Sequence, residues 1–347
     1  AALNKSISNS LYPKSLTRVA ASVFAQESLN CPNFLRKYGF QRFPQVSEEE
    51  REFPLAFIIL FHKDLDQVMF LLRAIYRPQN IYCLSVDLNS DISLINAARS
   101  VTACFDNVFL VKKLEPIVYA GFSRLKADLH CMDELVAVPV KWKYLFNMPG
   151  QQFPLSIIMQ LILSLNNILC IKHHFPSLGK HVVAETVGRN PPPPHNFRIV
   201  KGSAYGTFSR AFIEFALKTR QAQDLIEWSR DIESPDEYVW STLHHTDIMV
   251  VPGGYTGEPD AKRAMTTFVA WEREVPCATI YVRWIFISFS PDLPMLARRQ
   301  ELFANKFYID HHPTALHCMD EFIFNLTVTN TVRDLSFYRD LPFIRRG

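Results

Sequence analysis

An acidic pair in the second half of the chain stands where it could serve either a helix or a reaction. Residues 234–237 read Ser-Pro-Asp-Glu, which combines a plausible N-cap, a proline suited to the first helical position and two carboxylates. The helix dipole favours negative charge in the first turn, so an ordinary helix start is one interpretation. The other is that Glu237 projects into a crevice as a general base, because a positioned carboxylate can take the proton of a reacting hydroxyl.

Two cations in the last third of the chain lie among apolar residues. Arg283 falls in a strand predicted over residues 280–289, and Lys306 falls within the run Leu-Phe-Ala-Asn-Lys-Phe at 302–307. A charge in such surroundings needs a partner or a ligand, because burying it alone is costly. Each side chain could reach solvent or an acidic partner. Together they could instead neutralise a diphosphate.

The sequence Asp64-Leu65-Asp66 has the D-x-D form that often holds the metal ion of a sugar nucleotide. It opens the helix predicted after the first strand, where acidic residues serve as a cap. We interpret it as that cap and predict no metal ion here. Three adjacent histidine pairs, at 173–174, 244–245 and 311–312, are interpreted as surface or core residues, because sequence neighbours rarely ligate one ion together.

Composition and missing motifs exclude several classes of function. The 37 basic and 34 acidic residues leave a charge of +3 without a basic block, which argues against a nucleic-acid partner. With 48% hydrophobic residues and 11 glycines, disorder, collagen and coiled coil are excluded. No apolar run approaches the ~20 residues that a spanning helix needs. The chain carries no dinucleotide, P-loop or nucleophile-elbow motif.

The elements that must position these residues alternate between strand and helix. Residues 54–61 form a continuous apolar run, which is typical of a strand buried on both faces. The alternation predicts an α/β fold with a parallel sheet wrapped by helices. Ligands bind beyond the carboxyl ends of such strands, so His62, Asp87 and Asn147 should border one crevice. Further strands are predicted at 81–86, 107–111 and 142–148, and helices at 64–76, 92–104 and 123–136.

The two ends of the chain are less regular. Residues 1–50 are polar and irregular, and we interpret them as a stem leading into one large domain over 51–347. Four consecutive prolines at 191–194 indicate a surface connection. Beyond them, short helices are predicted at 208–217, 225–228 and 235–243, followed by the strand at 280–289 and a final helix at 293–302.

The seven cysteines leave two interpretations open. They lie far apart without a C-x-x-C pair, which argues against a zinc or redox motif. They are either inert buried thiols or partners in long-range disulfides made in the secretory pathway. Two N-glycosylation triplets, at Asn4 and Asn325, favour the second interpretation.

Several blocks in a fixed order carry a family resemblance. They are 53–56 (FPLA), 71–83 (LLRAIYRPQNIYC), 104–109 (CFDNVF), 119–129 (YAGFSRLKADL), 142–145 (WKYL), 202–205 (GSAY), 234–237 (SPDE) and 302–307 (LFANKF). Through these blocks the chain resembles the core 2 and I-branching β-1,6-N-acetylglucosaminyltransferases from about residue 53 to 322.

This resemblance implies a GT-A-type, Rossmann-like fold and a Golgi type II membrane protein whose anchor lies outside this sequence. It also implies inverting transfer from UDP-GlcNAc to an O-glycan or glycoprotein acceptor, with no metal or other cofactor. Carried over by position, Glu237 would be the catalytic base, Arg283 and Lys306 would hold the diphosphate, Leu60, His62 and Asp87 would bind uridine, and Trp271 and Asp236 would bind the sugar.

The resemblance further implies two disulfides, Cys83–Cys131 and Cys31–Cys104. A bridge closing a loop of about 50 residues is worth on the order of 4 kcal/mol in the chain-entropy model. No partner is implied for the three remaining cysteines, which are Cys170, Cys277 and Cys318.

Departures from the family pattern concern mainly the acceptor. Gln152 stands where the family carries an acidic residue, and Arg273 stands where it carries Tyr. The acceptor-binding segment between the fourth strand and Gly202 is short, and we place none of the family's Glu, Lys and Arg within 165–196. We predict core 2 branching, in which GlcNAc goes to the 6-hydroxyl of GalNAc in core 1 O-glycans. The alternatives are another acceptor, as in I-branching or peptide O-xylosylation, or a catalytically silent sugar-binding relative.

Overall fold

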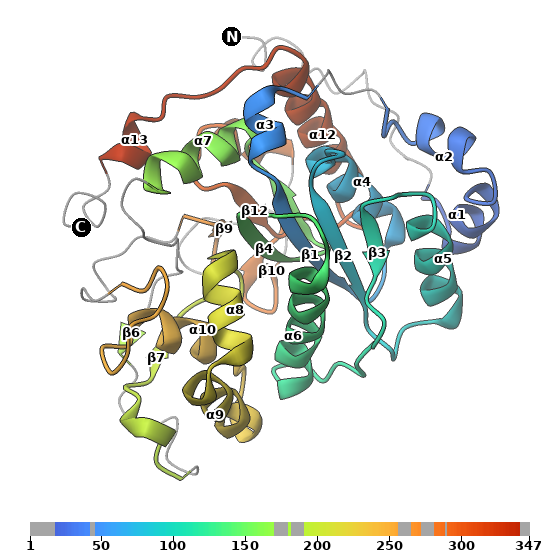
Figure 1. Cartoon of the computed structure of the whole chain (residues 1–347). Coiled ribbons are helices and arrows are strands. Elements are labelled where there is room, and N and C mark those ends of the chain that lie inside the picture. Colours follow the sequence, from blue (N-terminus) through green and yellow to red (C-terminus); the bar gives the residue numbers. More distant parts are fainter. Residues whose placement is uncertain are drawn as a thin grey trace.

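The computed structural model describes residues 18–41, 46–169, 180–181, 191–255, 265–271, 281–288 and 290–340. Its centre is a five-stranded sheet in the order β3-β2-β1-β4-β8 (Figure 1). Strands β1 to β4 run parallel, and β8 pairs antiparallel with β4 at one edge. The predicted α/β class with a mostly parallel sheet is confirmed. The strands are β1 (Leu55–Phe61), β2 (Ile81–Val86), β3 (Val108–Leu110), β4 (Tyr144–Pro149) and β8 (Thr207–Ser209).

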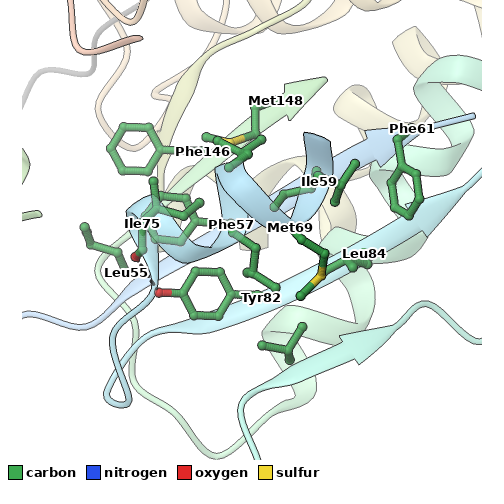
Figure 2. Close-up of a cluster of buried hydrophobic side chains, with 14 of the residues drawn as sticks. Leu55, Phe57, Ile59, Phe61, Met69, Ile75, Tyr82, Leu84, Phe146 and Met148 are labelled. Atoms are coloured by element: carbon green, nitrogen blue, oxygen red, sulfur yellow. Dashed lines mark hydrogen bonds between the residues drawn. The ribbon is translucent and has the colours of Figure 1, made fainter. Parts of the chain in front are cut away.

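Strand β1 is buried on both faces, as its apolar run predicts. Odd-numbered side chains such as Phe57 pack with α4 and α5, and even-numbered ones such as Ile58 pack with α6. Phe57 lies between Tyr82 and Phe146, with ring centroids 5.2 and 5.3 Å away (Figure 2). Because alternate strand residues face opposite sides, a continuous apolar run requires helices on both. These helices are α4 (Leu65–Ile75), α5 (Ile92–Thr102) and α6 (Phe122–Ala137).

The next part of the fold comprises the elements from β6 to α10, including the edge strand β8. The predicted short helices are confirmed, although β8 takes up the start of the one predicted at 208–217. Strand β8 pairs with β4, which is distant in the sequence. Local periodicity could not predict this strand, because its backbone partner lies in another segment. The elements here are β6 (Lys180–His181), which pairs with β7 (Val200–Lys201), and then α8 (Arg210–Lys218), α9 (Arg220–Trp228) and α10 (Asp236–His245).

The strand predicted at 280–289 is wrong. The chain instead forms a hairpin of β10 (Tyr281–Val282) and β11 (Ile285–Phe286), with Arg283 and Trp284 in its turn. Both turn residues have positive φ, 53° and 64°. Two-residue hairpin turns normally carry Asn-Gly or a similar pair, so this sequence holds no local signal for the turn.

The helix predicted at 293–302 is also wrong beyond its first turn. Only α11 (Leu293–Leu296) forms, and the chain continues as β12 (Phe303–Asn305), which is buried between two other strands. Those strands lie far away in the sequence, so the local pattern could not reveal them. The last long helix, α12 (Pro313–Val328), was not predicted. The remaining elements of this region are β5 (Gln152–Pro154), β9 (Thr267–Val269), α7 (Ile158–Leu169) and α13 (Ser336–Arg339).

The prediction that residues 1–50 are irregular is wrong for three segments. Helices α1 (Ala21–Glu27) and α2 (Cys31–Lys37) belong to the same core as β1, with Phe24 only 1% exposed. A third short helix, α3 (Glu48–Glu52), carries a capping box formed by Ser47 and Glu50. The division into a stem and a single domain stays a prediction.

Both disulfides implied by the resemblance are formed. Cys31–Cys104 joins α2 to the residue just beyond the cap of α5, and Cys83–Cys131 joins β2 to α6, with Cα atoms 4.9 and 5.9 Å apart. Cys170 and Cys277 lie outside the described residues. Within those residues, no helix combines the length and the apolar character needed to cross a membrane.

Candidate active site

The carboxyl ends of β1 and β2 hold two of the residues predicted to bind uridine. His62 follows β1 and Asp87 follows β2, and the Asp87 amide donates to the Phe61 carbonyl at 2.9 Å. The Asp87 carboxylate accepts from the amides of Asn89 and Ile117, both at 2.9 Å. The parallel sheet therefore brings these two strand ends to one edge, as predicted.

His62 and Leu60 offer different groups at this edge. Burial, and then the nearby charges of Lys63 and Arg283, lower the pKa of His62. The imidazole is therefore neutral at neutral pH and can both donate and accept a hydrogen bond. Leu60 is 9% exposed with its side chain in the core beside α6, and its carbonyl accepts from the Gly150 amide at 2.8 Å. The uridine-binding roles stay predictions.

Lys306 and Arg283 lie close together, but only Lys306 is buried. Lys306 follows β12 with 9% of its surface exposed, and its ammonium donates to the Val282 carbonyl at 3.4 Å. Burial, and then the charge of Arg283, lower the pKa of Lys306 to about 8. The prediction that Arg283 is a buried cation is wrong, because the hairpin turn exposes it. Its guanidinium lies 3.9 Å from the centroid of the Tyr119 ring.

The arrangement of these two cations favours an anionic ligand. Within the part of the chain that the structure describes, neither Arg283 nor Lys306 forms an ion pair with a carboxylate. Besides burial, the charge of Arg283 lowers the pKa of Lys306, and a negative group bound between the two cations would relieve that repulsion. A diphosphate is such a group, because its oxygens accept from both a guanidinium and an ammonium.

Glu237 lies in the first turn of α10, as predicted, but Ser234 does not cap the helix. Pro235 occupies the cap position, and Ser234 has a positive φ of 54°. The Ser234 amide donates to the Ala120 carbonyl at 2.6 Å, and its own carbonyl accepts from the Glu237 amide at 2.9 Å. The left-handed backbone of Ser234 joins the start of α10 to another loop, which a side-chain cap would not do.

The Glu237 carboxyl is partly enclosed and paired. Its Oε2 lies 3.2 Å from the ammonium of Lys201 on β7, and the side chain is 28% exposed. Burial raises the pKa of Glu237, and the charge of Lys201 opposes that rise. A raised pKa makes the carboxylate a stronger base, which suits removal of a proton from a hydroxyl. The structure thus gives Glu237 the surroundings of a base, while its role stays a prediction.

Arg124 and Asp128 form a buried ion pair next to the first turn of α10, and this pair was not predicted. Arg124 of α6 lies 2.5 Å from Asp128, which has no exposed surface, and 3.3 Å from Asp236. Asp128 also accepts a hydrogen bond from the side-chain Nδ2 of Asn147 at 3.1 Å. The Tyr205 ring centroid lies 5.3 Å from the Arg124 guanidinium. The spacing of Arg124 and Asp128 by four residues in a predicted helix was the available signal. Asp236, predicted to bind sugar, is engaged by Arg124 here.

The Gly-Ser-Ala-Tyr-Gly segment, residues 202–206, is tied to both sides of this region. The Gly202 amide donates to the Glu237 carbonyl at 2.7 Å. Asn147 of β4 accepts from the Gly206 amide and donates to the Ala204 carbonyl, both at 2.7 Å. A Cβ on Gly206 would lie 2.6 Å from the Phe208 ring, so this position requires glycine. Asn147 lies within β4, in register with Ile58 of β1, and joins residues 202–206 to the sheet instead of lying beyond the strand ends as predicted.

One loop, residues 115–120 between β3 and α6, contacts Asp87, Arg283 and the turn before Glu237. Through Ile117 it binds Asp87, and through Tyr119 it stacks on Arg283. Through the Ala120 carbonyl it receives the Ser234 amide that positions α10. Ala120 has a positive φ of 56°, a strained conformation for a residue other than glycine. The loop therefore contacts a residue, or the neighbour of a residue, from each of the three predicted groups.

The prediction that Asp64 and Asp66 cap α4 is wrong in its detail. Asp64 occupies the cap position, but its side chain makes no capping hydrogen bond. Arg18 binds both carboxylates at 2.6 Å, and Lys63 lies 2.9 Å from Asp64. No group of three His, Cys, Asp or Glu able to hold a metal ion occurs in the described ranges. Metal independence itself stays a prediction.

Two residues near the cations bear on the sugar end of the site. Trp271 is 46% exposed and forms an isolated backbone bridge with Ile285, which follows the turn that holds Arg283. Gln152 of β5 pairs in register with Asn305, which precedes Lys306, and donates to Thr267 at 2.8 Å. Arg273, the other departure from the family pattern, lies outside the described residues.

Comparisons with known proteins agree with this architecture. The profile of the Core-2/I-Branching enzyme family matches residues 55–289. The mouse N-acetyllactosaminide β-1,6-N-acetylglucosaminyl-transferase is 36% identical over 85% of this chain and 78% of its own length. The human β-1,3-galactosyl-O-glycosyl-glycoprotein β-1,6-N-acetylglucosaminyltransferase is 35% identical over 84% of this chain and 74% of its own. A bovine herpesvirus 4 protein named for the same activity is 33% identical over 87% and 74%. The chain therefore belongs to the Core-2/I-branching enzyme family and is a glycosyltransferase.

Proposed function

We propose that this protein transfers N-acetylglucosamine from UDP-GlcNAc to the 6-hydroxyl of GalNAc in core 1 O-glycans, with inversion at the anomeric carbon. One observation carries the proposal: loop 115–120 contacts Asp87, Arg283 and the turn before Glu237. A nucleotide edge, a cationic pair and an enclosed carboxylate therefore belong to one connected site. The activity in the names of its relatives supports the donor sugar and the linkage.

In the proposed reaction Glu237 acts on the acceptor. Its carboxylate takes the proton of the 6-hydroxyl while that oxygen attacks the anomeric carbon of GlcNAc. The new bond forms on the face opposite the departing UDP, so a single displacement inverts the configuration. The raised pKa of Glu237 favours this proton transfer.

Arg283 and Lys306 act on the leaving group. Negative charge grows on the diphosphate as its bond to the sugar breaks, and two fixed cations stabilise that charge as a divalent metal ion would. Asp64 and Asp66 are already engaged by Arg18, which supports a reaction that uses no D-x-D metal. His62 and Asp87 would face the uridine, and Trp271 the donor sugar.

We further propose that the protein works in the secretory pathway, in the Golgi lumen. The two disulfides support this, because such bonds persist in oxidising compartments. The partners are a UDP-sugar donor and an O-glycan or glycoprotein acceptor.

A second acceptor is supported by one specific observation. The mouse relative named for N-acetyllactosaminide is 36% identical, slightly above the 33–35% of the O-glycosyl-glycoprotein relatives described above. I-type branching uses the same donor and the same base on a different hydroxyl-bearing sugar. The two functions therefore differ only in what the acceptor side of the site recognises.

The deciding experiment is donor turnover with a panel of acceptors. Purified protein is incubated with UDP-GlcNAc and galactosyl-GalNAc, with N-acetyllactosamine, or with neither, and products are assigned by mass and NMR linkage analysis. A β-1,6 product on galactosyl-GalNAc supports the proposal. A product on N-acetyllactosamine alone assigns I-branching. Tight UDP binding with no transfer to any acceptor would identify a silent relative and overturn the proposal.

A further inference from the structure

Lys201 touches the proposed base and has no part in the chemistry described above beyond its charge. Its ammonium lies 3.2 Å from Glu237 Oε2, and its side chain is 48% exposed. Glu237 Oε1 takes part in no hydrogen bond within the described part of the chain. One carboxylate oxygen is therefore engaged by the protein, and the other is left for an incoming hydroxyl.

The contact between Lys201 and Glu237 joins two elements that are fixed to each other. On one side of Lys201, the Val200 amide donates to the hydroxyl of Thr242 on α10 at 2.9 Å. On the other side, the Gly202 amide donates to the Glu237 carbonyl at 2.7 Å. These two hydrogen bonds hold the backbone of Lys201 against α10, which keeps the lysine side chain within reach of the Glu237 carboxylate.

The other charges that face Glu237 are already paired. From α10 itself, Asp236 raises the pKa of Glu237, and from α6, Arg124 lowers it. Arg124, however, lies 2.5 and 3.3 Å from Asp128 and Asp236, so most of its charge is neutralised there. Tyr238 acts on Lys201: its ring centroid lies 5.6 Å from the ammonium, and, against the effect of burial, a hydrogen bond with this side chain helps to raise the pKa of Lys201. Lys201 is thus the cation in direct contact with the Glu237 carboxylate.

We propose that Lys201 is a positioning residue for catalysis, which holds Glu237 ionised through Oε2 and so presents Oε1 to the acceptor hydroxyl. This inference rests on the proposed role of Glu237 as base. Enclosure alone favours the protonated acid, and a protonated carboxyl cannot accept the proton of the acceptor. The lysine keeps its own proton throughout, and the acceptor proton goes to Glu237.

The test is the pH dependence of kcat/KM in Lys201→Met, Lys201→Gln and Lys201→Arg. Removing the positive charge raises the pKa of Glu237, so more of the enzyme is protonated at low pH. The acidic limb of the two neutral variants should move to higher pH by about one pH unit, with recovery toward the wild-type rate at alkaline pH. Lys201→Arg, which keeps the charge, should resemble the wild type. Lys218→Met, on the exposed end of α8, is the matched control.

The outcomes separate this inference from the proposed function. Unfolding temperature and UDP affinity are measured for each variant, and Lys201→Gln replaces Lys201→Met if the latter does not fold. A neutral variant whose profile superimposes on the wild type, or that loses the same factor at every pH, overturns the role of Lys201. If Glu237→Gln is inactive in the same assay, the base survives that result. If Glu237→Gln keeps the wild-type rate and profile, both proposals fall.

Discussion

The proposed base and the proposed diphosphate-binding cations occupy regions of the molecule that are built in different ways. The base region, made of β7, α10 and the start of α6, holds its charges in pairs: Lys201 with Glu237, and Arg124 with Asp128. The cation region, made of the β10–β11 turn and the residue after β12, holds Arg283 and Lys306 without a carboxylate partner among the described residues. In the first region these charges are balanced by partners within the protein. In the second region a bound anion would supply the counter-charge.

This difference separates two kinds of catalytic contribution. A base must be in the correct protonation state before the substrate arrives, so the protein supplies its counter-charge. Groups that stabilise a leaving group must respond to charge that appears during the reaction, so a permanent internal partner would weaken them. The following changes test whether the two regions contribute to catalysis in these different ways.

The largest effect is expected from Glu237→Gln. Loss of a general base commonly lowers kcat by about 10²- to 10⁴-fold, while the diphosphate and uridine contacts are untouched. Turnover should collapse and UDP affinity, measured by calorimetry, should stay within about twofold. Glu233→Gln, on the exposed turn before α10, is the control and should keep full activity. Retained turnover in Glu237→Gln would remove this residue from its role.

Alanine at Arg283 or Lys306 should come next. Each change should lower kcat by up to about 10²-fold, because a preorganised charge on the leaving group is lost. In a metal-free thermal shift assay, UDP at a hundredfold excess over its Kd should stabilise the wild type by about 2.7 kcal/mol. Uridine at the same concentration should stabilise it much less. Both variants should lose that difference. Equal protection by the two ligands would show that these cations do not bind the diphosphate.

Arg124→Met should affect stability more than chemistry. Asp128 is fully buried, and removing its cation leaves an uncompensated charge, a change that typically costs about 3–5 kcal/mol. The free energy of unfolding from urea titration checks this. Arg230→Met removes an exposed pair with Glu227 and should change stability by less than about 1 kcal/mol. Equal small effects would mean that the base region is not organised by its buried pair.

UDP affinity should weaken above the pKa of Lys306. In the free protein burial and Arg283 lower that pKa to about 8, so the ammonium loses its proton as pH rises through this value. A bound diphosphate favours the charged form, and linkage then weakens binding by at most about tenfold per pH unit. Calorimetric titrations from pH 6.5 to 9.5 in Lys306→Met should show no such dependence. A flat wild-type profile contradicts direct contact with the diphosphate.

The smallest effect, none at all, is expected from chelation. Excess EDTA should leave the initial rate unchanged, because Arg283 and Lys306 supply the charge and Arg18 occupies Asp64 and Asp66. A rate that falls on chelation and returns with Mn²⁺ would mean that the D-x-D sequence, or another carboxylate pair, had been wrongly dismissed.

Several parts of this site could be predicted from the sequence because their cause is local. The apolar run of β1 required helices on both sides, and the strand ends therefore had to bring His62 and Asp87 to one edge. The Ser-Pro-Asp-Glu run placed Glu237 in a first helical turn. The family blocks gave the two disulfides, which no spacing rule could have paired.

The sequence by itself thus determined the layered fold, the start of α10 and the types of the reacting groups. Only the tertiary structure decided how each charge is balanced. Arg283 lies in a hairpin turn within an apolar stretch, Arg18 forms an ion pair with the D-x-D carboxylates, and Lys201 forms one with Glu237. Secondary structure follows from periodicity within one segment. The partner of a charge comes from another segment, brought close by strand pairing and core packing across 36 or more residues in each of these ion pairs.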